Sequence, residues 1–134
     1  MQAAVLLEKL EIFDDEVISR NKVAKRYSSN INESIKTPHI PNGYLSSWAQ
    51  YSVILPEDLE RQSVMNQLKN KDIPSMVYYQ TPLHLQSVFN ELGYKRGDFP
   101  VSVKISEKVL SLPMHSYLDL EQQNHVLNVI EEVN

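Results

Sequence analysis

The sequence contains no cysteine, which excludes a disulfide framework, a thiolate metal site and a cysteine nucleophile. Only three glycines occur, Gly43, Gly93 and Gly97, and they form neither a P-loop nor a dinucleotide-binding fingerprint. No apolar run approaches the roughly 18 residues of a membrane-spanning helix, and the N-terminal residues lack the basic-then-apolar order that is typical of a secretory signal. Because the lack of cysteine fits a reducing compartment, we expect a cytoplasmic protein without a membrane segment.

The charged residues are scattered and form no basic run. Lysine and arginine number 13 against 17 acidic residues, for a net charge of −4, so we expect no nucleic-acid partner. The four histidines show none of the HxH, HxxxH or HExxH spacings of a metal site, and no GxSxG elbow marks a serine nucleophile. A chain of 134 residues with 42% hydrophobic residues suits one globular domain.

Residues 2–35 are predicted to be helical, because apolar residues recur every three, four or seven positions and glycine and proline are absent. No capping residue precedes Ala3, which favours a chain that begins inside a longer helix. A straight helix of this length would span ~50 Å, far more than the ~13 Å radius of gyration of a 100-residue domain. Two alternatives stay open: the helix breaks near Asp14–Asp15, or it bridges to another domain.

The remainder is predicted to form a small α+β sandwich, with a largely antiparallel sheet of about three strands covered by helices. The expected strands are Trp48–Leu55, Met76–Tyr79 and Leu110–Met114. The expected helices are Glu57–Asn70, Gln86–Leu92 ended by Gly93, Pro100–Val109, and a last helix that opens at the capping box Asp119-x-x-Gln122.

Some side chains have a purely structural interpretation. Neighbouring residues of a strand point to opposite faces, so one of Tyr78 and Tyr79 is expected in the core and the other at a surface or cleft. Trp48 is expected in the core at the end of its strand, and Arg61 is expected to be solvated on its helix.

Two motifs carry a family resemblance: PLHLQ at residues 82–86 and LSLPMH at residues 110–115. With the segment between them, they resemble the C-terminal part of the DegT/DnrJ/StrS family of pyridoxal-phosphate-dependent sugar aminotransferases. The likeness extends upstream to QAAVLLEKLEIFDDEVISRNKVAKRY and SWAQYSVIL, and downstream to LDLEQQNHVLNVI, so it covers essentially the whole chain.

The resemblance implies the small domain of a fold type I aminotransferase. Residues 1–36 would be the long helix between the domains, residues 37–134 the small domain, and the large cofactor-binding domain would be absent. The parent enzyme would be a homodimer that uses pyridoxal phosphate to transfer an amino group from glutamate to a nucleotide-linked keto-deoxysugar for polysaccharide synthesis. The cofactor lysine lies in the missing half of the family's chain, so this chain alone is expected to bind no cofactor, to contain no catalytic residue and to be inactive.

Within this chain the resemblance points to His84 and Tyr79 as side chains that hydrogen-bond the sugar nucleotide, although both could instead pack in the core. The sequence departs from the family at Gln80, Asp72 and Val103, where proline, glycine and an acidic residue are common. Asp72 can still adopt a left-handed cap, whereas Gln80 puts the sugar specificity in doubt.

Two other functions stay open. A short protein could keep the small-domain fold as a stand-alone binding or dimerisation module without catalysis. A helical scaffold built on residues 2–35 is the third alternative. An upstream reading frame with a cofactor lysine would favour the enzyme.

Overall fold

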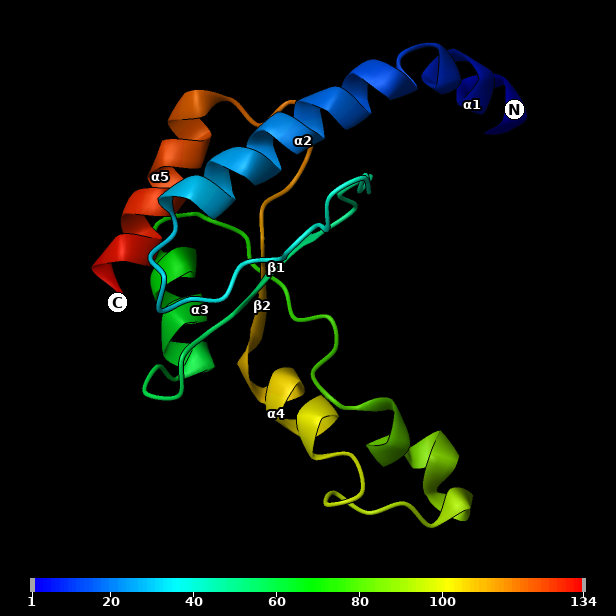
Figure 1. The fold of residues 1–134 in the computed structure, drawn as a ribbon, viewed down its shortest axis with the longest axis vertical. Coiled ribbons are helices and arrows are strands. Elements are labelled where there is room, and N and C mark those ends of the chain that lie inside the picture. The colour runs from blue at the N-terminus through cyan, green and yellow to red at the C-terminus, as the bar shows by residue number, and fades with distance from the viewer. Residues whose placement is uncertain (1, 134) are drawn as a thin grey trace.

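The computed structural model describes residues 2–133, which form a C-shaped molecule. Two helices run along one arm of the C, a small sheet lies in the middle, and residues 77–108, the distal lobe, form the other arm (Figure 1). In chain order the elements are α1 (Gln2–Glu11), α2 (Phe13–Asn30), β1 (Tyr51–Ile54), α3 (Arg61–Asn70), η1 (Leu83–Leu85), η2 (Ser87–Leu92), α4 (Pro100–Lys108), β2 (Val109–Leu112) and α5 (Leu120–Glu132). No helix in the described part of the chain is both long and apolar enough to cross a membrane.

The N-terminal helix is broken, as one of the two alternatives predicted. The break lies at Ile12, two residues before Asp14, and α1 points away from the line of α2 (Figure 1). Asp14, Asp15 and Glu16 then occupy the first turn of α2, where negative charge is favourable. The predicted end at residue 35 is wrong, because Ile31 already has an extended backbone with ψ 135°.

The sheet has two full strands, β1 and β2, paired antiparallel with Tyr51 opposite Leu112 and Val53 opposite Leu110. The predicted alternation is confirmed for Tyr51, Val53 and Leu55, which are all buried. The predicted strand start at Trp48 is wrong, because Trp48 has a φ of +50° and cannot continue an extended strand. Its indole is nevertheless buried, as expected.

The predicted third strand, Met76–Tyr79, is wrong. Met76 makes one antiparallel bridge to Ser111, with the two reciprocal backbone hydrogen bonds, and the chain then leaves the sheet for the distal lobe. Tyr78 and Tyr79 are both exposed, so neither takes the predicted core position. On the opposite edge of the sheet, Lys36 forms a similar single bridge to Ile54.

The core lies between the sheet and the helices α2, α3 and α5, which lie together on one side of the strands (Figure 1). Tyr27 of α2 is fully buried and its ring centroid is 5.0 Å from that of Tyr51. The predicted capping box of α5 is confirmed between Asp119 and Gln122. Gln123, on the predicted inner face of α5, is buried and donates from Nε2 to the carbonyl of Val23 at 2.7 Å.

The helices near the distal lobe are shorter than predicted. Helix α3 begins at Arg61 rather than Glu57, because the Glu60 carboxylate caps it. The predicted helix Gln86–Leu92 is not an α-helix: Ser87–Leu92 form the 3₁₀ helix η2, and Gln86 lies between it and the preceding 3₁₀ turn η1. The left-handed cap at Gly93 is confirmed with a φ of +72°, and Asp72 takes a φ of +57°.

Arg61 is not solvated, contrary to the prediction. Its guanidinium donates to the backbone carbonyls of Ser106 and Val109, at the end of α4. In return, Lys108 Nζ donates to the carbonyls of Glu57 and Leu59 at 2.9 and 2.8 Å. These two cations join the base of the distal lobe to the start of α3.

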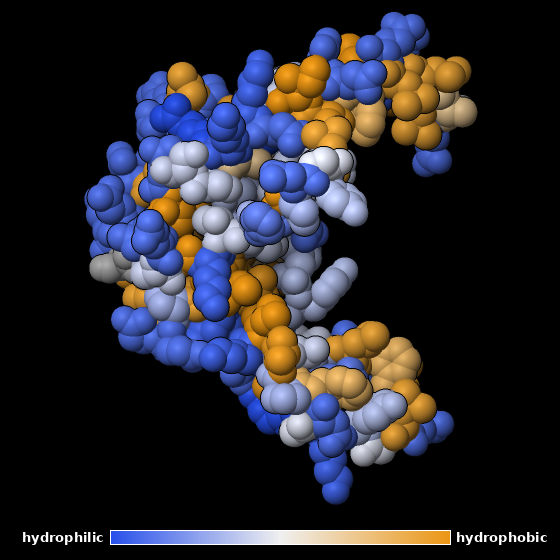
Figure 2. Space-filling model, viewed as in Figure 1, coloured by the Kyte–Doolittle hydropathy of each residue, from blue (hydrophilic) through white to orange (hydrophobic). Residues whose placement is uncertain are grey.

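Apolar side chains are exposed at both arms of the C (Figure 2). On α1, none of whose residues is buried, Val5, Leu6, Leu7 and Leu10 are each more than 60% exposed. On the distal lobe, the exposed apolar and aromatic residues are Tyr78, Tyr79, Leu83, Val88, Leu92, Tyr94, Phe99, Val101 and Ile105.

Candidate functional site

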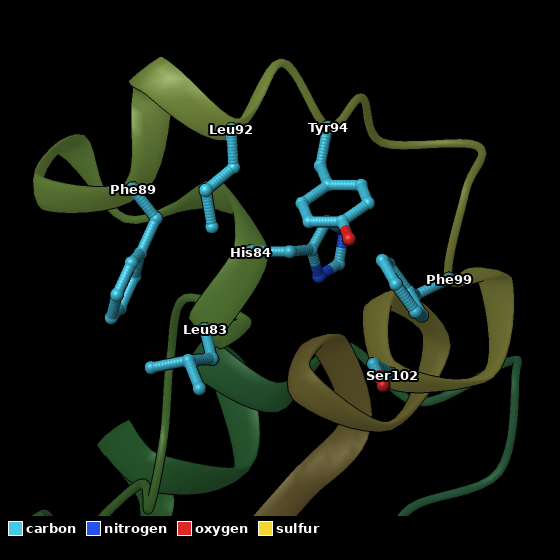
Figure 3. A pocket seen from close by; sticks show the side chains of 7 residues that line it. All are labelled: Leu83, His84, Phe89, Leu92, Tyr94, Phe99 and Ser102. Atoms are coloured by element: carbon cyan, nitrogen blue, oxygen red, sulfur yellow. The ribbon is translucent and has the colours of Figure 1, made fainter.

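The distal lobe carries an open cavity of about 310 Å³ between η1, η2 and the start of α4. It is lined by Leu83, His84, Phe89, Leu92, Tyr94, Phe99 and Ser102. In Figure 3 the side chains of Leu83, Phe89 and Leu92 lie on one side and the rings of His84, Tyr94 and Phe99 on the other. Six of the seven lining residues are apolar or aromatic, which is typical of small-molecule pockets with few orienting polar groups.

His84 enters the cavity from η1. Pro82, with φ −56° and ψ 145°, precedes this single turn, and the Leu85 amide closes it on the Pro82 carbonyl at 2.9 Å. The imidazole centroid is 4.7 Å from the ring of Phe99. Its Nε2 atom is buried and has no hydrogen-bond partner among the described residues. A buried nitrogen without a partner is costly, so a ligand that hydrogen-bonds here would gain affinity.

Tyr94 and Phe99 complete the aromatic wall, with ring centroids 5.2 Å apart and planes at 71°. A tight turn brings them together: the Lys95 amide donates to the Asp98 carboxylate at 2.7 Å, and the Asp98 amide donates to the Lys95 carbonyl at 3.0 Å. Neither Tyr94 nor Phe99 was among the site residues predicted from the sequence. Aromatic side chains on either side of a Gly-containing turn were the available signal.

Tyr79 lies outside the cavity, in an adjoining groove of about 540 Å³. The groove is lined by Tyr78, Tyr79, Thr81, Pro82, Leu83, Gln86, Ser102, Ile105, Ser106 and Val109. Cavity and groove share Leu83 and Ser102. The two predicted site residues therefore line neighbouring hollows rather than one: His84 the cavity, and Tyr79, whose side chain is exposed, the groove.

Charged groups are absent from the lining of both hollows. Among the described residues, α4 forms ion pairs through Lys104 with Glu57, at 2.6 Å, and through Glu107 with Arg96, and the hydrogen bond from Lys104 lowers the pKa of the Glu57 carboxyl. No group of three or more His, Asp or Glu residues that could bind a metal occurs among residues 2–133. The site offers aromatic surface and a few neutral polar atoms.

Comparison with known proteins extends over the whole chain. A sequence profile described as the DegT/DnrJ/EryC1/StrS aminotransferase family matches residues 1–131. A "Pleiotropic regulatory protein" of Geobacillus stearothermophilus is 39% identical over 98% of this chain. The UDP-2-acetamido-2-deoxy-3-oxo-D-glucuronate aminotransferase of Pseudomonas aeruginosa is 40% identical over 89% of it.

A solved structure agrees with these matches. The crystal structure of a DegT DnrJ EryC1 StrS aminotransferase from Brucella abortus is similar with a TM-score of 0.88 and 41% identity, over 98% of this chain and 34% of that one. The chain spans about a third of the length of the curated relatives, 36% and 32% in the two cases above.

Proposed function

Because the chain belongs to the DegT/DnrJ/EryC1/StrS aminotransferase family, we propose that the whole protein transfers an amino group from glutamate to the keto carbon of a nucleotide-linked deoxysugar. The keto oxygen of the sugar leaves as water, and a second water supplies the keto oxygen of the 2-oxoglutarate that remains from glutamate, so the exchange balances. The support is the relative in Pseudomonas aeruginosa, which is named for a UDP-linked keto sugar.

We assign the 134 residues to the small domain and its connecting helix. Residues 1–36 connect it to a large domain, and residues 37–134 form the small domain itself. The break at Ile12 and the uncovered apolar side chains of α1 support an element that lies against further protein. The whole enzyme is proposed to be a homodimer in the cytoplasm.

Pyridoxal phosphate is the cofactor that the family implies, and the described residues do not fit it. A Schiff-base lysine needs an enclosed, desolvated setting next to the substrate. Eight of the nine lysines in this chain are exposed, and the ninth, Lys108, directs its Nζ to two backbone carbonyls. We therefore place cofactor binding and catalysis in the rest of the whole protein, and propose that this chain alone is inactive.

The observation that carries the proposal is the match of residues 1–131 to the aminotransferase family, and the pair of hollows in the distal lobe is where we expect this chain to meet the substrate. His84 in the cavity and Tyr79 in the groove are proposed to contact the nucleotide-linked sugar. Gln80 lines a shallow hollow with Tyr79 and Gln86, so it stands where it can influence which sugar is accepted.

A second candidate function is a binding or dimerisation module without catalysis. The exposed apolar residues of α1 favour it, because they suit a protein partner as well as a large domain. Under this alternative the hollows bind a ligand that is not transformed.

The test compares this chain with the product of its intact gene. With pyridoxal phosphate added, we expect the whole protein to show a visible Schiff-base band that survives dialysis and to form 2-oxoglutarate from glutamate with a UDP-linked keto sugar. The 134-residue chain should show neither. A dialysis-resistant band on the chain alone would overturn the domain assignment, and an intact gene that encodes nothing further would favour the binding module.

A further inference from the structure

We propose that the cavity of the distal lobe holds the pyrimidine base of the sugar nucleotide, while the sugar follows the adjoining groove past Tyr79. This inference rests on the proposed function, which supplies the nucleotide. It assigns a role to Tyr94 and Phe99.

The walls of the cavity suit a flat ring. The rings of His84, Tyr94 and Phe99 stand on one side and the side chains of Leu83, Phe89 and Leu92 on the other (Figure 3). A base that enters between them stacks on aromatic carbon and is covered by apolar carbon on its second face. Such stacking depends little on which base is present, and it is a common source of affinity for nucleotides.

The polar atoms of the cavity are too few for a hexose. Each buried sugar hydroxyl needs a hydrogen-bond partner, and an unpaired one is costly. The cavity side chains that carry such atoms are His84, Tyr94 and Ser102. A pyrimidine has two apolar faces and needs partners only along one edge, so it matches this lining better.

The buried Nε2 of His84 can pair with that edge in either neutral tautomer. If Nε2 carries hydrogen, it donates to a carbonyl oxygen of the base. If it carries the lone pair, it accepts from the N3–H group of uracil or thymine. A nitrogen that lacks a partner among the described residues would then be satisfied by the ligand.

The groove continues from the cavity because the two share Leu83 and Ser102. Its side chains include the hydroxyls of Tyr79, Thr81 and Ser102 and the amide of Gln86, which suit a ribose and a hexose. None of its lining residues is charged, so this chain offers the phosphates little. Uridine and UDP should therefore bind the 134-residue chain with similar affinity.

Nuclear magnetic resonance of the full 134-residue chain tests the assignment. We expect uridine and UDP to shift the ring signals of His84, Tyr94 and Phe99, with intermolecular Overhauser effects from the H5 and H6 protons of the base to Tyr94 or Phe99. Ribose 5-phosphate, which lacks a base, should leave these signals unchanged. Absence of uridine-induced shifts at millimolar concentration, or equal shifts with ribose 5-phosphate, would overturn the proposal.

Substitutions give an independent measurement. Phe99→Leu removes one stacking ring and should weaken uridine binding about tenfold. Tyr44→Leu is the matched control, because Tyr44 is an exposed aromatic residue that lines neither hollow. The Tyr44→Leu variant should bind uridine as tightly as the parent chain. If Phe99→Leu perturbs the lobe, the Overhauser effects on the unmodified chain decide the matter. Equal binding by the parent and a folded Phe99→Leu variant would count against the base site.

The two proposals can fail separately. If the whole protein transaminates a UDP-sugar but uridine does not contact Tyr94 or Phe99, the base site is wrong and the function stands. If uridine binds in the cavity but the whole protein transfers no amino group, the base site stands and the enzymatic function is wrong.

Discussion

Replacement of Arg61 by leucine should loosen the distal lobe at its base. In the native chain the Arg61 guanidinium donates to the carbonyl of Ser106, which lies in the last turn of α4 and has no partner within the helix, and to the carbonyl of Val109, the first residue of β2. A hydrogen bond from a charged group contributes about 1.5–3 kcal/mol when it is well formed. One of these two bonds is 3.3 Å long and Arg61 is only partly buried, so we expect the pair to contribute about 2 kcal/mol in total.

Urea unfolding followed by circular dichroism measures this loss. With an m-value of about 2 kcal/mol per M, a loss of about 2 kcal/mol lowers the urea midpoint by about 1 M. Arg61→Lys keeps the charge but lacks the forked donor, so it should lose about half as much. Gln67→Ala, at an exposed position of the same helix, is the matched control and should change the free energy of unfolding by less than about 0.5 kcal/mol.

A second readout separates this reasoning from a general loss of stability. Amide hydrogen exchange in α4 should accelerate more than exchange in α5, because only α4 is held by Arg61. The reasoning is refuted if Arg61→Leu matches Gln67→Ala in urea, or if exchange in α4 and α5 rises equally.

Three further predictions concern the core and the turn of the lobe. Leu110→Ala, at a fully buried strand position, should cost about 2–5 kcal/mol in urea unfolding, and a cost below about 1 kcal/mol would contradict the assigned core. Gly93→Ala should cost about 1 kcal/mol because of its φ of +72° alone, since no atom lies within 4 Å of the new methyl group; a neutral result would speak against the left-handed cap. Burial raises the pKa of the Tyr27 phenol above its ordinary value of 10.0. The phenol therefore ionises in the unfolded state at a lower pH than in the folded state. The free energy of unfolding should be unaffected by this group below pH 10 and should fall as the pH rises above 10. Urea midpoints at pH 8 and pH 10.5 should show a smaller fall for Tyr27→Phe than for the parent, and equal falls would be inconsistent with that shift.

The features that local patterns determine were predictable from the sequence. The two-residue alternation of Tyr51, Val53 and Leu55 identified one strand face, and the capping box at Asp119 marked the start of the last helix. These elements depend on neighbours within a few residues. The PLHLQ and LSLPMH motifs indicated the family, which the sequence profile confirms.

The features that distant contacts determine were not predictable. Arg61 was expected in solvent because its carbonyl partners lie 45 and 48 residues away. Met76–Tyr79 has strand-like composition, yet only Met76 finds a partner across the sheet, and nothing local marks where the chain departs. His84 was identified through a motif, whereas Tyr94 and Phe99 join it only because a turn folds them over η1.

The two single-residue bridges at the edges of the sheet affect how copies of this chain meet. A bare strand edge invites another strand to add to it, and lysine or proline at an edge discourages this. Here Lys36 covers the β1 side, and Met76, two residues after Pro74, covers the β2 side. The segments that contain Lys36 and Met76 each pair with the sheet at one residue and then leave it. Among the described residues, the four-residue strands β1 and β2 therefore offer no long row of unpaired amides for growth into fibrils. Any self-association should accordingly proceed through helix surfaces, reversibly and with little change in strand content.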